Sequence, residues 1–199
     1  MALPRNIHPH FLKILSDNVG LRQEEIRSFL EYWDSRVLKK KDFLLNPGDI
    51  CRETAYVNRG CFRRYLISES NKESILNFAT EDWWVGDLES FFLEKPTLYT
   101  IQALEESEVL TLSRRNYLRV VEIFPKYKSF HEEKIRRTFF ATLKRATAAK
   151  IESPEEKYLK LAKEQPDLFQ RIPLHYIASY LGIEPESLSR LRKRLAIKP

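Results

Sequence analysis

The spacing of apolar residues changes twice along the chain. Over residues 11–39, apolar side chains recur every three or four positions, a period that predicts helices. Over residues 42–112, short runs of aromatic and β-branched residues are separated by turn sequences such as NPGD (46–49) and SESNKE (68–73). Strands separated by such closely spaced turns predict an antiparallel roll or sandwich.

A helical period returns after residue 112. Residues 113–124 predict a short amphipathic helix that ends at Pro125, and residues 125–151 contain no internal proline or glycine. At 1.5 Å per residue, a continuous helix over this second run would be about 40 Å long. It could pack on its own sheet or join two copies of the chain, and we favour dimerisation because of its length. Its apolar stripe consists of Phe130, Ile135, Phe139, Leu143 and Ala146, with Phe140 beside it.

The end of the chain has the spacing of a helix-turn-helix. Ser153 and Pro154 begin a preceding helix. Ala178 is the small residue that two crossing helices need, and Gly182 suits the positive φ of a tight turn. Pro185 fits the first turn of the second helix. The apolar positions that face inward are Ile177, Leu181, Ile183, Leu188 and Leu191.

The outward positions of this second helix are polar, and they form a candidate DNA-binding surface. Such a helix can enter a major groove, with its first side chains on base edges and its basic ones near phosphates. We expect Arg190 to read guanine and Glu186 to accept a hydrogen bond from cytosine. His175 is a candidate phosphate contact. The alternative is a three-helix unit that docks on a protein, with Arg192 on a solvated face. The outward residues are Glu186, Ser187, Ser189, Arg190, Lys193 and Arg194.

Charge and composition narrow the choice of partner and compartment. The net charge is +6 and the pI about 9.2, which favours an anionic partner. Residues 185–199 hold five basic residues and one acid, so +4 of the +6 lies there. The sequence shows neither a signal peptide nor a run of about 18 apolar residues, so we expect a cytoplasmic protein.

The chain offers little for catalysis or metal binding. Two cysteines are too few for an iron–sulfur cluster or a zinc site, and four scattered histidines belong to no catalytic motif. We therefore expect no metal, no cofactor and no enzymatic activity, with Cys51 and Cys61 as reduced thiols.

In its order of roll, long helix and C-terminal reader, the chain resembles the Crp/Fnr family of bacterial transcription regulators. The sequence PGD (47–49), Gly60 and residues 85–114 are similar to the family's cyclic-nucleotide-binding roll and its phosphate-binding cassette. The segment LHYIASYLGIEPESLSRLRKRL resembles its DNA-reading element, with Glu186 and Arg190 where the family's base-contacting Glu and Arg fall.

The resemblance implies an α+β fold in three parts. These are a double-stranded β-helix (jelly-roll, cyclic-nucleotide-binding-like) domain with N-terminal helices at residues 1–124, a dimerisation helix at 125–151 and a winged-helix-like helix-turn-helix domain at 152–199. It also implies a homodimer on a palindromic double-stranded DNA site, with RNA polymerase as a candidate partner and no membrane attachment. We expect the usual wing hairpin to be missing, because the sequence stops at Pro199.

The cassette departs from the pattern that binds cyclic AMP. Family members that bind it have a Gly-Glu-Leu run followed by an Arg-Ser/Thr-Ala triplet, whose Arg pairs with the cyclic phosphate. Here the triplet reads Thr97-Leu98-Tyr99, and a buried phosphate without its charged hydrogen-bond partner loses about 2–3 kcal/mol. We expect no cyclic AMP binding, with Leu98 and Tyr99 filling the ligand space. A repositioned Lys95 or Arg64 is the alternative source of charge. The candidate effector-pocket residues are Gly86, Asp87, Leu88, Thr97, Leu98 and Tyr99.

The sequence therefore leaves two candidate functions for this protein. The first is a homodimeric, sequence-specific DNA-binding transcription regulator. The second is a nucleotide-responsive regulatory module that acts through a protein partner and uses the basic helix as a docking surface. Binding to DNA distinguishes the two.

Overall fold

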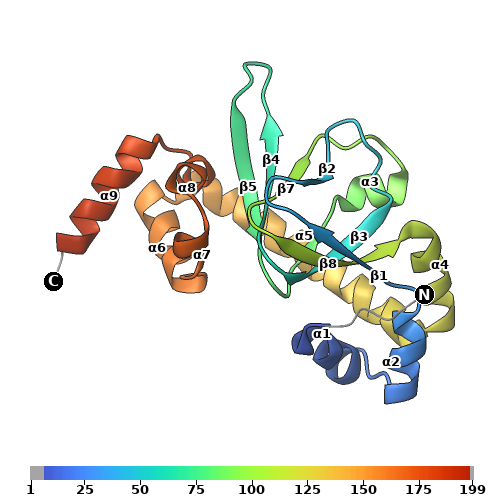
Figure 1. Ribbon diagram of the computed structural model, residues 1–199. Helices are drawn as coiled ribbons and strands as arrows, with labels where there is room; N and C mark the ends of the chain where they lie inside the picture. The colour runs from blue at the N-terminus through green and yellow to red at the C-terminus, as the bar shows by residue number, and fades with distance from the viewer. Residues whose placement is uncertain (1–6, 198–199) are drawn as a thin grey trace. The chain divides into compact units, whose positions relative to one another are not determined.

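The computed structural model describes residues 7–197, apart from the side chains of residues 145, 148, 149, 196 and 197 (Figure 1). The chain divides into two compact units. One unit is formed by the residues up to Arg64 together with Phe78–Phe139, and the other by Tyr65–Asn77 together with the residues from Phe140 onward. The division into domains near residues 124 and 151 remains a prediction.

The strands form two antiparallel four-stranded sheets, with the orders β1-β8-β3-β6 and β2-β7-β4-β5. In the first sheet, Asp34 of β1 lies opposite Thr111 of β8, and Glu53 of β3 lies opposite Ser113. The roll and the α+β class predicted from the sequence are confirmed. The strands are β1 (Asp34–Leu38), β2 (Phe43–Leu45), β3 (Glu53–Arg59), β4 (Phe62–Ile67), β5 (Glu73–Ala79), β6 (Trp84–Val85), β7 (Thr100–Ala103) and β8 (Ser107–Ser113).

The N-terminal helices end earlier than the sequence predicts. The helices are α1 (Pro9–Lys13), the π-helical turn η1 (Ile14–Asn18) and α2 (Gln23–Leu30). The prediction of helix up to residue 39 is wrong for residues 34–38, which form β1. Only Leu38 of this strand is buried, so buried and exposed residues do not alternate along it as they do in a strand with one face in the core. Its conformation depends on pairing with β8, which lies about 70 residues further along the chain.

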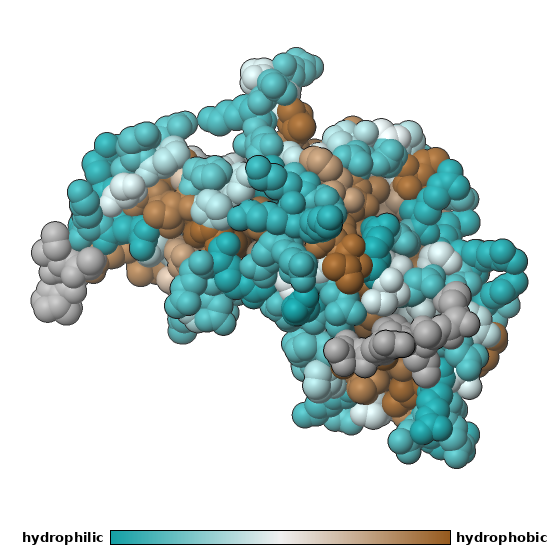
Figure 2. Space-filling model, viewed as in Figure 1, coloured by the Kyte–Doolittle hydropathy of each residue, from teal (hydrophilic) through white to brown (hydrophobic). Residues whose placement is uncertain are grey.

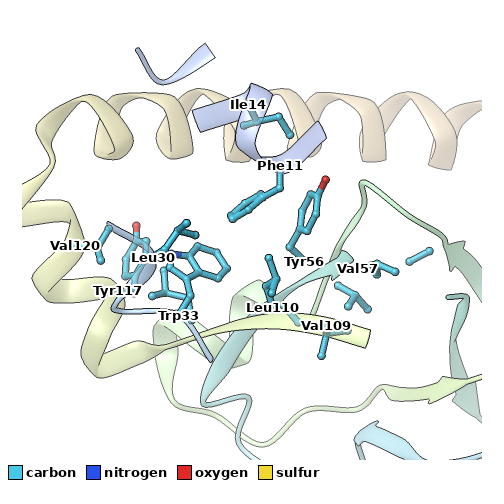
Figure 3. Close-up of a cluster of buried hydrophobic side chains, with 14 of the residues drawn as sticks. Phe11, Ile14, Leu30, Trp33, Tyr56, Val57, Val109, Leu110, Tyr117 and Val120 are labelled. Carbon is cyan, nitrogen blue, oxygen red and sulfur yellow. The ribbon is translucent and has the colours of Figure 1, made fainter. Parts of the chain in front are cut away.

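An aromatic cluster holds these N-terminal helices on the roll (Figure 3). The ring of Phe11 lies 4.5 Å from Tyr56 of β3 and 5.2 Å from Trp33, centroid to centroid. Phe29 of α2 lies 4.8 Å from Tyr127. All five side chains are at most 1% exposed. Aromatic pairs at these separations add to the free energy gained by burying their surface.

The predicted helices after the roll are confirmed. Ser113 caps α4 (Arg114–Ile123) by accepting a hydrogen bond from the Asn116 N–H, and α5 covers Pro125–Ile151. The start of α5 packs on the roll, because Tyr127 and His131 are buried.

The middle of α5 lies in a different environment. Every residue from 136 to 144 is exposed. Phe139, Phe140 and Leu143 are 59%, 55% and 49% exposed, although they are large and apolar. The face of the molecule in Figure 2 is mostly hydrophilic, with apolar residues surfacing in separate patches. The helix therefore packs on its own roll at the start, as one sequence interpretation predicts, and carries exposed apolar side chains further on; dimerisation through them stays a prediction.

The second unit contains four further helices, which pack around a small apolar core. Ser153 caps α6 with Pro154 in the first turn, as the sequence predicts, and it also forms a capping box with Glu156. The ring of Tyr158 lies 5.1 Å from Phe169 in an edge-on contact. In the part of the chain that the structure describes, no helix is long and apolar enough to cross a membrane. The helices are α6 (Pro154–Glu164), α7 (Leu168–Arg171), α8 (Leu174–Leu181) and α9 (Pro185–Ile197).

Candidate nucleic-acid interface and effector pocket

The turn between α8 and α9 has the geometry that the sequence predicts for a helix-turn-helix. Gly182 adopts φ 73°, in the left-handed region where glycine carries no Cβ penalty. The Ile183 N–H donates to the Ala178 carbonyl over 3.0 Å, which ends α8 in a Schellman arrangement. Ala178 is fully buried. The apolar residues of this small core are Ile177, Leu181, Leu188 and Leu191, all at most 6% exposed, with Ile183 half-buried.

The predicted DNA-contacting side chains lie together on the outer face of α9. Glu186, Ser189, Arg190, Lys193 and Arg194 are exposed, while Ser187 is half-buried; Lys198 lies outside the described residues. The α9 N-terminus is the positive end of the helix dipole, which favours an acidic residue in its first turn such as Glu186.

Two of the arginines on this face already have partners within the protein. Arg190 Nη2 donates to Ser187 Oγ over 2.9 Å, one helical turn earlier. Arg194 forms an ion pair with Glu155 at the start of α6. The guanidinium of Arg190 is therefore aligned along the helix, and that of Arg194 is shared with a carboxylate. The sequence pattern predicted that both side chains point outward, but not that either has a partner within the protein.

His175 lies in the first turn of α8 rather than on α9. Its side chain is exposed, and its ring stands 4.0 Å from that of Tyr176. A phosphate contact from this position remains a prediction.

In the cassette, the structure brings Gly86, Asp87 and Thr97 together. Asp87 is 7% exposed and starts α3 (Leu88–Leu93), where its Oδ1 accepts hydrogen bonds from the backbone N–H groups of Glu89 and Ser90. Its Oδ2 accepts a 2.7 Å hydrogen bond from the Thr97 hydroxyl. Both carboxylate oxygens are therefore used within the protein.

The other three cassette candidates do not converge on that carboxylate. Leu88 is 36% exposed, and Leu98 is 75% exposed. The expectation that Leu98 fills a buried ligand space is therefore wrong, because its side chain turns toward solvent. Tyr99 is half-buried, and the guanidinium carbon of Arg64 stands 4.8 Å over its ring. Arg64 thus approaches the cassette from β4, as one alternative in the sequence analysis suggested.

A series of hydrogen bonds behind the cassette was not predicted from the sequence. The Cys51 N–H donates to Ser90 Oγ over 2.8 Å, and the Ser90 hydroxyl donates to the Lys95 carbonyl. The Cys51 thiol donates to the Glu53 carbonyl, and burial raises its pKa, so the thiol stays protonated and unreactive. Both cysteines are thiols and not a disulfide, and both are buried. The run Asp87-Leu-Glu-Ser90 is a helix-start pattern that could have indicated the Asp87 cap.

A pocket of about 480 Å³ opens into the roll next to these hydrogen bonds of Cys51. Its lining includes Leu45 of β2, Ala55 of β3, Val85 of β6 and Ile101 of β7, so both sheets contribute. Of the predicted cassette residues it includes only Gly86. The sequence indicated Gly48, Asp49 and Gly86 of its lining, but it did not indicate the wall residues that come from four separate strands.

A titratable pair lies where α5 packs on the roll. His131 is 4% exposed, its Nδ1 stands 3.1 Å from the Tyr117 hydroxyl, and its ring stacks on Tyr127 at 5.7 Å. Burial and the nearby Lys134 lower the pKa of His131 to about 4. Burial also lowers the pKa of Lys134 to about 8, although Asp82 opposes this effect. The Lys134 ammonium stands 4.9 Å over the ring of Trp84. Among the described residues, no cluster of three or more side chains suited to a metal ion occurs.

The fold and the cassette together define a class of protein, one with a cyclic-nucleotide-binding type of roll followed by a long helix and a helix-turn-helix unit. Residues 35–123 match the family model of the cyclic nucleotide-binding domain. No curated protein sequence gives a significant match to the chain.

Solved structures narrow this class. The catabolite activator protein of Thermus thermophilus is 23% identical with a TM-score of 0.57, covering 89% of this chain and 84% of that one. A CooA mutant from Carboxydothermus hydrogenoformans is 18% identical with a TM-score of 0.66, covering 98% and 86%. CLP of Xanthomonas campestris, titled a c-di-GMP responsive global regulator, is 16% identical with a TM-score of 0.68, covering 86% and 90%.

These structures belong to regulators of the Crp/Fnr family. The chain has the Crp/Fnr fold over most of its length, so the resemblance predicted from the sequence is confirmed.

Proposed function

We propose that the chain is a homodimeric transcription regulator that binds a specific palindromic DNA site and does not respond to cyclic AMP. The observation that carries the proposal is the outer face of α9. There Glu186 and Arg190 are exposed in the first two turns, above a core closed by Leu188 and Leu191. A rigid helix that presents its first turns in this way fits the major groove.

The apolar surface of α5 supports dimerisation. Phe139 and Leu143 lie one helical turn apart, each about half exposed, and Phe140 adjoins them. Large apolar side chains grouped on an exposed helix are characteristic of a protein interface. A twofold dimer would place two α9 helices in successive major grooves about 34 Å apart, so the DNA site should be an inverted repeat.

The cassette does not fit cyclic AMP. The phosphate of that ligand would meet Thr97 where the binding members of the family have an arginine, and the hydroxyl of Thr97 already donates to Asp87. The Asp87 carboxylate also accepts two backbone N–H groups of α3, so a ribose hydroxyl would have to displace hydrogen bonds that hold the fold.

Selection of binding sites from a random DNA library tests the proposal. Inverted repeats should be recovered, with half-sites about one helical turn apart. Arg190→Ala should weaken the selected site by about 1–3 kcal/mol and relax the preference at one base pair per half-site. Lys193→Ala, the matched control, should weaken all sequences alike. If the two variants lose affinity identically across mismatched sites, the assignment of a base reader and a phosphate contact is wrong.

The dimer and the effector are tested on the same protein. Sedimentation should give monomers for the double variant Phe139→Glu, Leu143→Glu, and unchanged dimers would contradict the proposed interface. Calorimetric titration with millimolar cyclic AMP should give no saturable heat. Binding in the micromolar range would show that the cassette can rearrange around the ligand.

A further inference from the structure

A side chain from α8 covers the open edge of strand β5. This strand is the last one in its sheet, so the backbone groups on its outer edge have no neighbouring strand to pair with. The Ser179 hydroxyl of α8 donates to the Glu73 carbonyl over 3.1 Å and accepts from the Ile75 N–H over 3.2 Å. One hydroxyl thus bonds to two groups that a further strand would use.

These hydrogen bonds lie within the second compact unit of the chain. That unit contains residues 65–77, which we call the hairpin segment, together with the residues from Phe140 onward. Tyr65 and Ile75 of the hairpin segment are 4% and 5% exposed. Among the described residues, neither belongs to the buried apolar cluster of the roll. The hairpin segment is therefore part of the unit that contains the helix-turn-helix.

A second link joins the hairpin segment to the start of α9. Lys72 Nζ stands 3.4 Å from Glu184 Oε1, and Glu184 directly precedes Pro185, the first residue of α9. The two side chains are 72% and 71% exposed, so this ion pair adds little free energy. Its position is informative, because it shows that the hairpin segment reaches both helices of the helix-turn-helix.

The two links, which we call the hairpin clasp, leave the outer face of α9 open. In the contacts that the structure describes, Glu186, Ser189 and Arg190 take no part in the hairpin clasp, and all three are exposed. A DNA groove could therefore receive this face without breaking the hydrogen bonds of Ser179. A binding unit that is already ordered loses less conformational entropy when it binds, so the clasp favours binding.

We propose that the hairpin segment positions the DNA-reading helix and that Ser179 is the positioning residue. Its hydroxyl holds α8 on the edge of β5, and α8 in turn holds α9 through the buried contacts of Leu181 and Leu188. This inference rests on the proposed DNA binding, but the hairpin clasp itself can be measured without DNA.

Hydrogen exchange at the Ile75 amide of the full chain tests the clasp. Ser179→Ala removes the acceptor of this N–H, so its exchange should accelerate about tenfold. Ser179→Thr keeps the hydroxyl and should keep the protection. The matched control is Ser74→Ala, which changes an exposed serine next to Ile75 that lies outside the clasp. Unchanged exchange in Ser179→Ala would overturn the proposal.

DNA affinities measured by fluorescence anisotropy test the positioning role. The probes are a duplex selected from the random library and a duplex of unrelated sequence. Ser179→Ala should bind the selected duplex about three- to tenfold more weakly and the unrelated duplex within about twofold of the wild type. Ser179→Thr and Ser74→Ala should match the wild type on both duplexes, and circular dichroism checks that each variant is folded.

The unrelated duplex separates positioning from a general loss of structure. Equal losses on both duplexes in Ser179→Ala would show that the hydroxyl only stabilises the fold, and an unchanged affinity for the selected duplex would show that the clasp does not position α9. Either result overturns the inference and leaves the proposed DNA binding in place. A wild type without any preferred duplex would overturn both proposals.

Discussion

Acid should destabilise this protein through one buried side chain, His131. Its pKa is about 4 in the folded protein, against 6.5 for an ordinary histidine, because the ring is buried and lies near Lys134. The unfolded chain therefore binds a proton more readily than the folded one, and stability falls as the pH drops from 6.5 toward 4. Integrating the difference in proton binding gives a loss of about 2 kcal/mol by pH 5 and about 3 kcal/mol by pH 4.

Urea unfolding at pH 7.5, 6 and 5, followed by circular dichroism, measures this loss. One protein concentration must be used throughout, because the proposed dimerisation would make apparent stability depend on concentration. His131→Phe keeps an aromatic ring against Tyr127 but cannot titrate. Its loss of stability between pH 7.5 and 5 should be about 2 kcal/mol smaller than that of the wild type. The exposed His175→Phe is the matched control and should follow the wild type.

Comparison of the wild type with His131→Phe also decides whether His131 causes the loss of stability in acid. His131→Phe removes the contact to the Tyr117 hydroxyl, so its absolute stability will change, and only the difference between the two pH values is informative. If wild type and His131→Phe lose the same free energy of unfolding between pH 7.5 and 5, the buried imidazole does not control the acid response. The loss of stability in acid would then come from other titratable groups, which both proteins share.

Three further substitutions probe contacts that are already made within the protein. Asp87→Ala removes a helix cap and a partner of a buried hydroxyl, so urea unfolding should show a loss of about 2–3 kcal/mol; no loss would mean that the carboxylate is free for a ligand. Glu155→Gln removes the carboxylate that pairs with Arg194. The affinity for DNA should therefore rise, and the slope of log K against log salt should steepen by about one phosphate contact. An unchanged slope would show that Arg194 does not contact DNA. Ser187→Ala removes the hydroxyl that accepts a hydrogen bond from Arg190. The difference in binding free energy between the preferred DNA site and mismatched sites should then fall by about 0.5–1 kcal/mol. An unaltered difference would show that this hydrogen bond does not position Arg190.

The parts of this protein that could be predicted from the sequence are those fixed by nearby residues. Gly182 and Pro185 define the turn and the start of α9 within four positions, and the absence of proline and glycine after Pro125 defines α5. Strand β1 could not be predicted, because its residues become a strand only by pairing with β8. Local pattern and long-range pairing thus disagree there, and the pairing decides.

The same distinction separates the two candidate sites. The outer face of α9 follows from helical periodicity, so the sequence indicated its residues correctly as a group that points outward. The state of the cassette depends on a hydrogen bond between Asp87 and Thr97, which are ten residues apart and meet only because α3 folds between them. The sequence pattern placed both residues in a ligand site, but only the structure shows that they are hydrogen-bonded to each other.

This internal hydrogen bond bears on how the roll could act as a sensor. A ligand shifts a conformational equilibrium only by its difference in affinity for two states. The cassette already satisfies its own polar groups through Asp87 and Thr97, so a nucleotide would gain little by entering it. Cys51, in contrast, lines the roll pocket and donates its backbone N–H to Ser90 of α3. The hydrogen bond from Cys51 to Ser90 therefore links the wall of the pocket to α3 without involving the pair of Asp87 and Thr97.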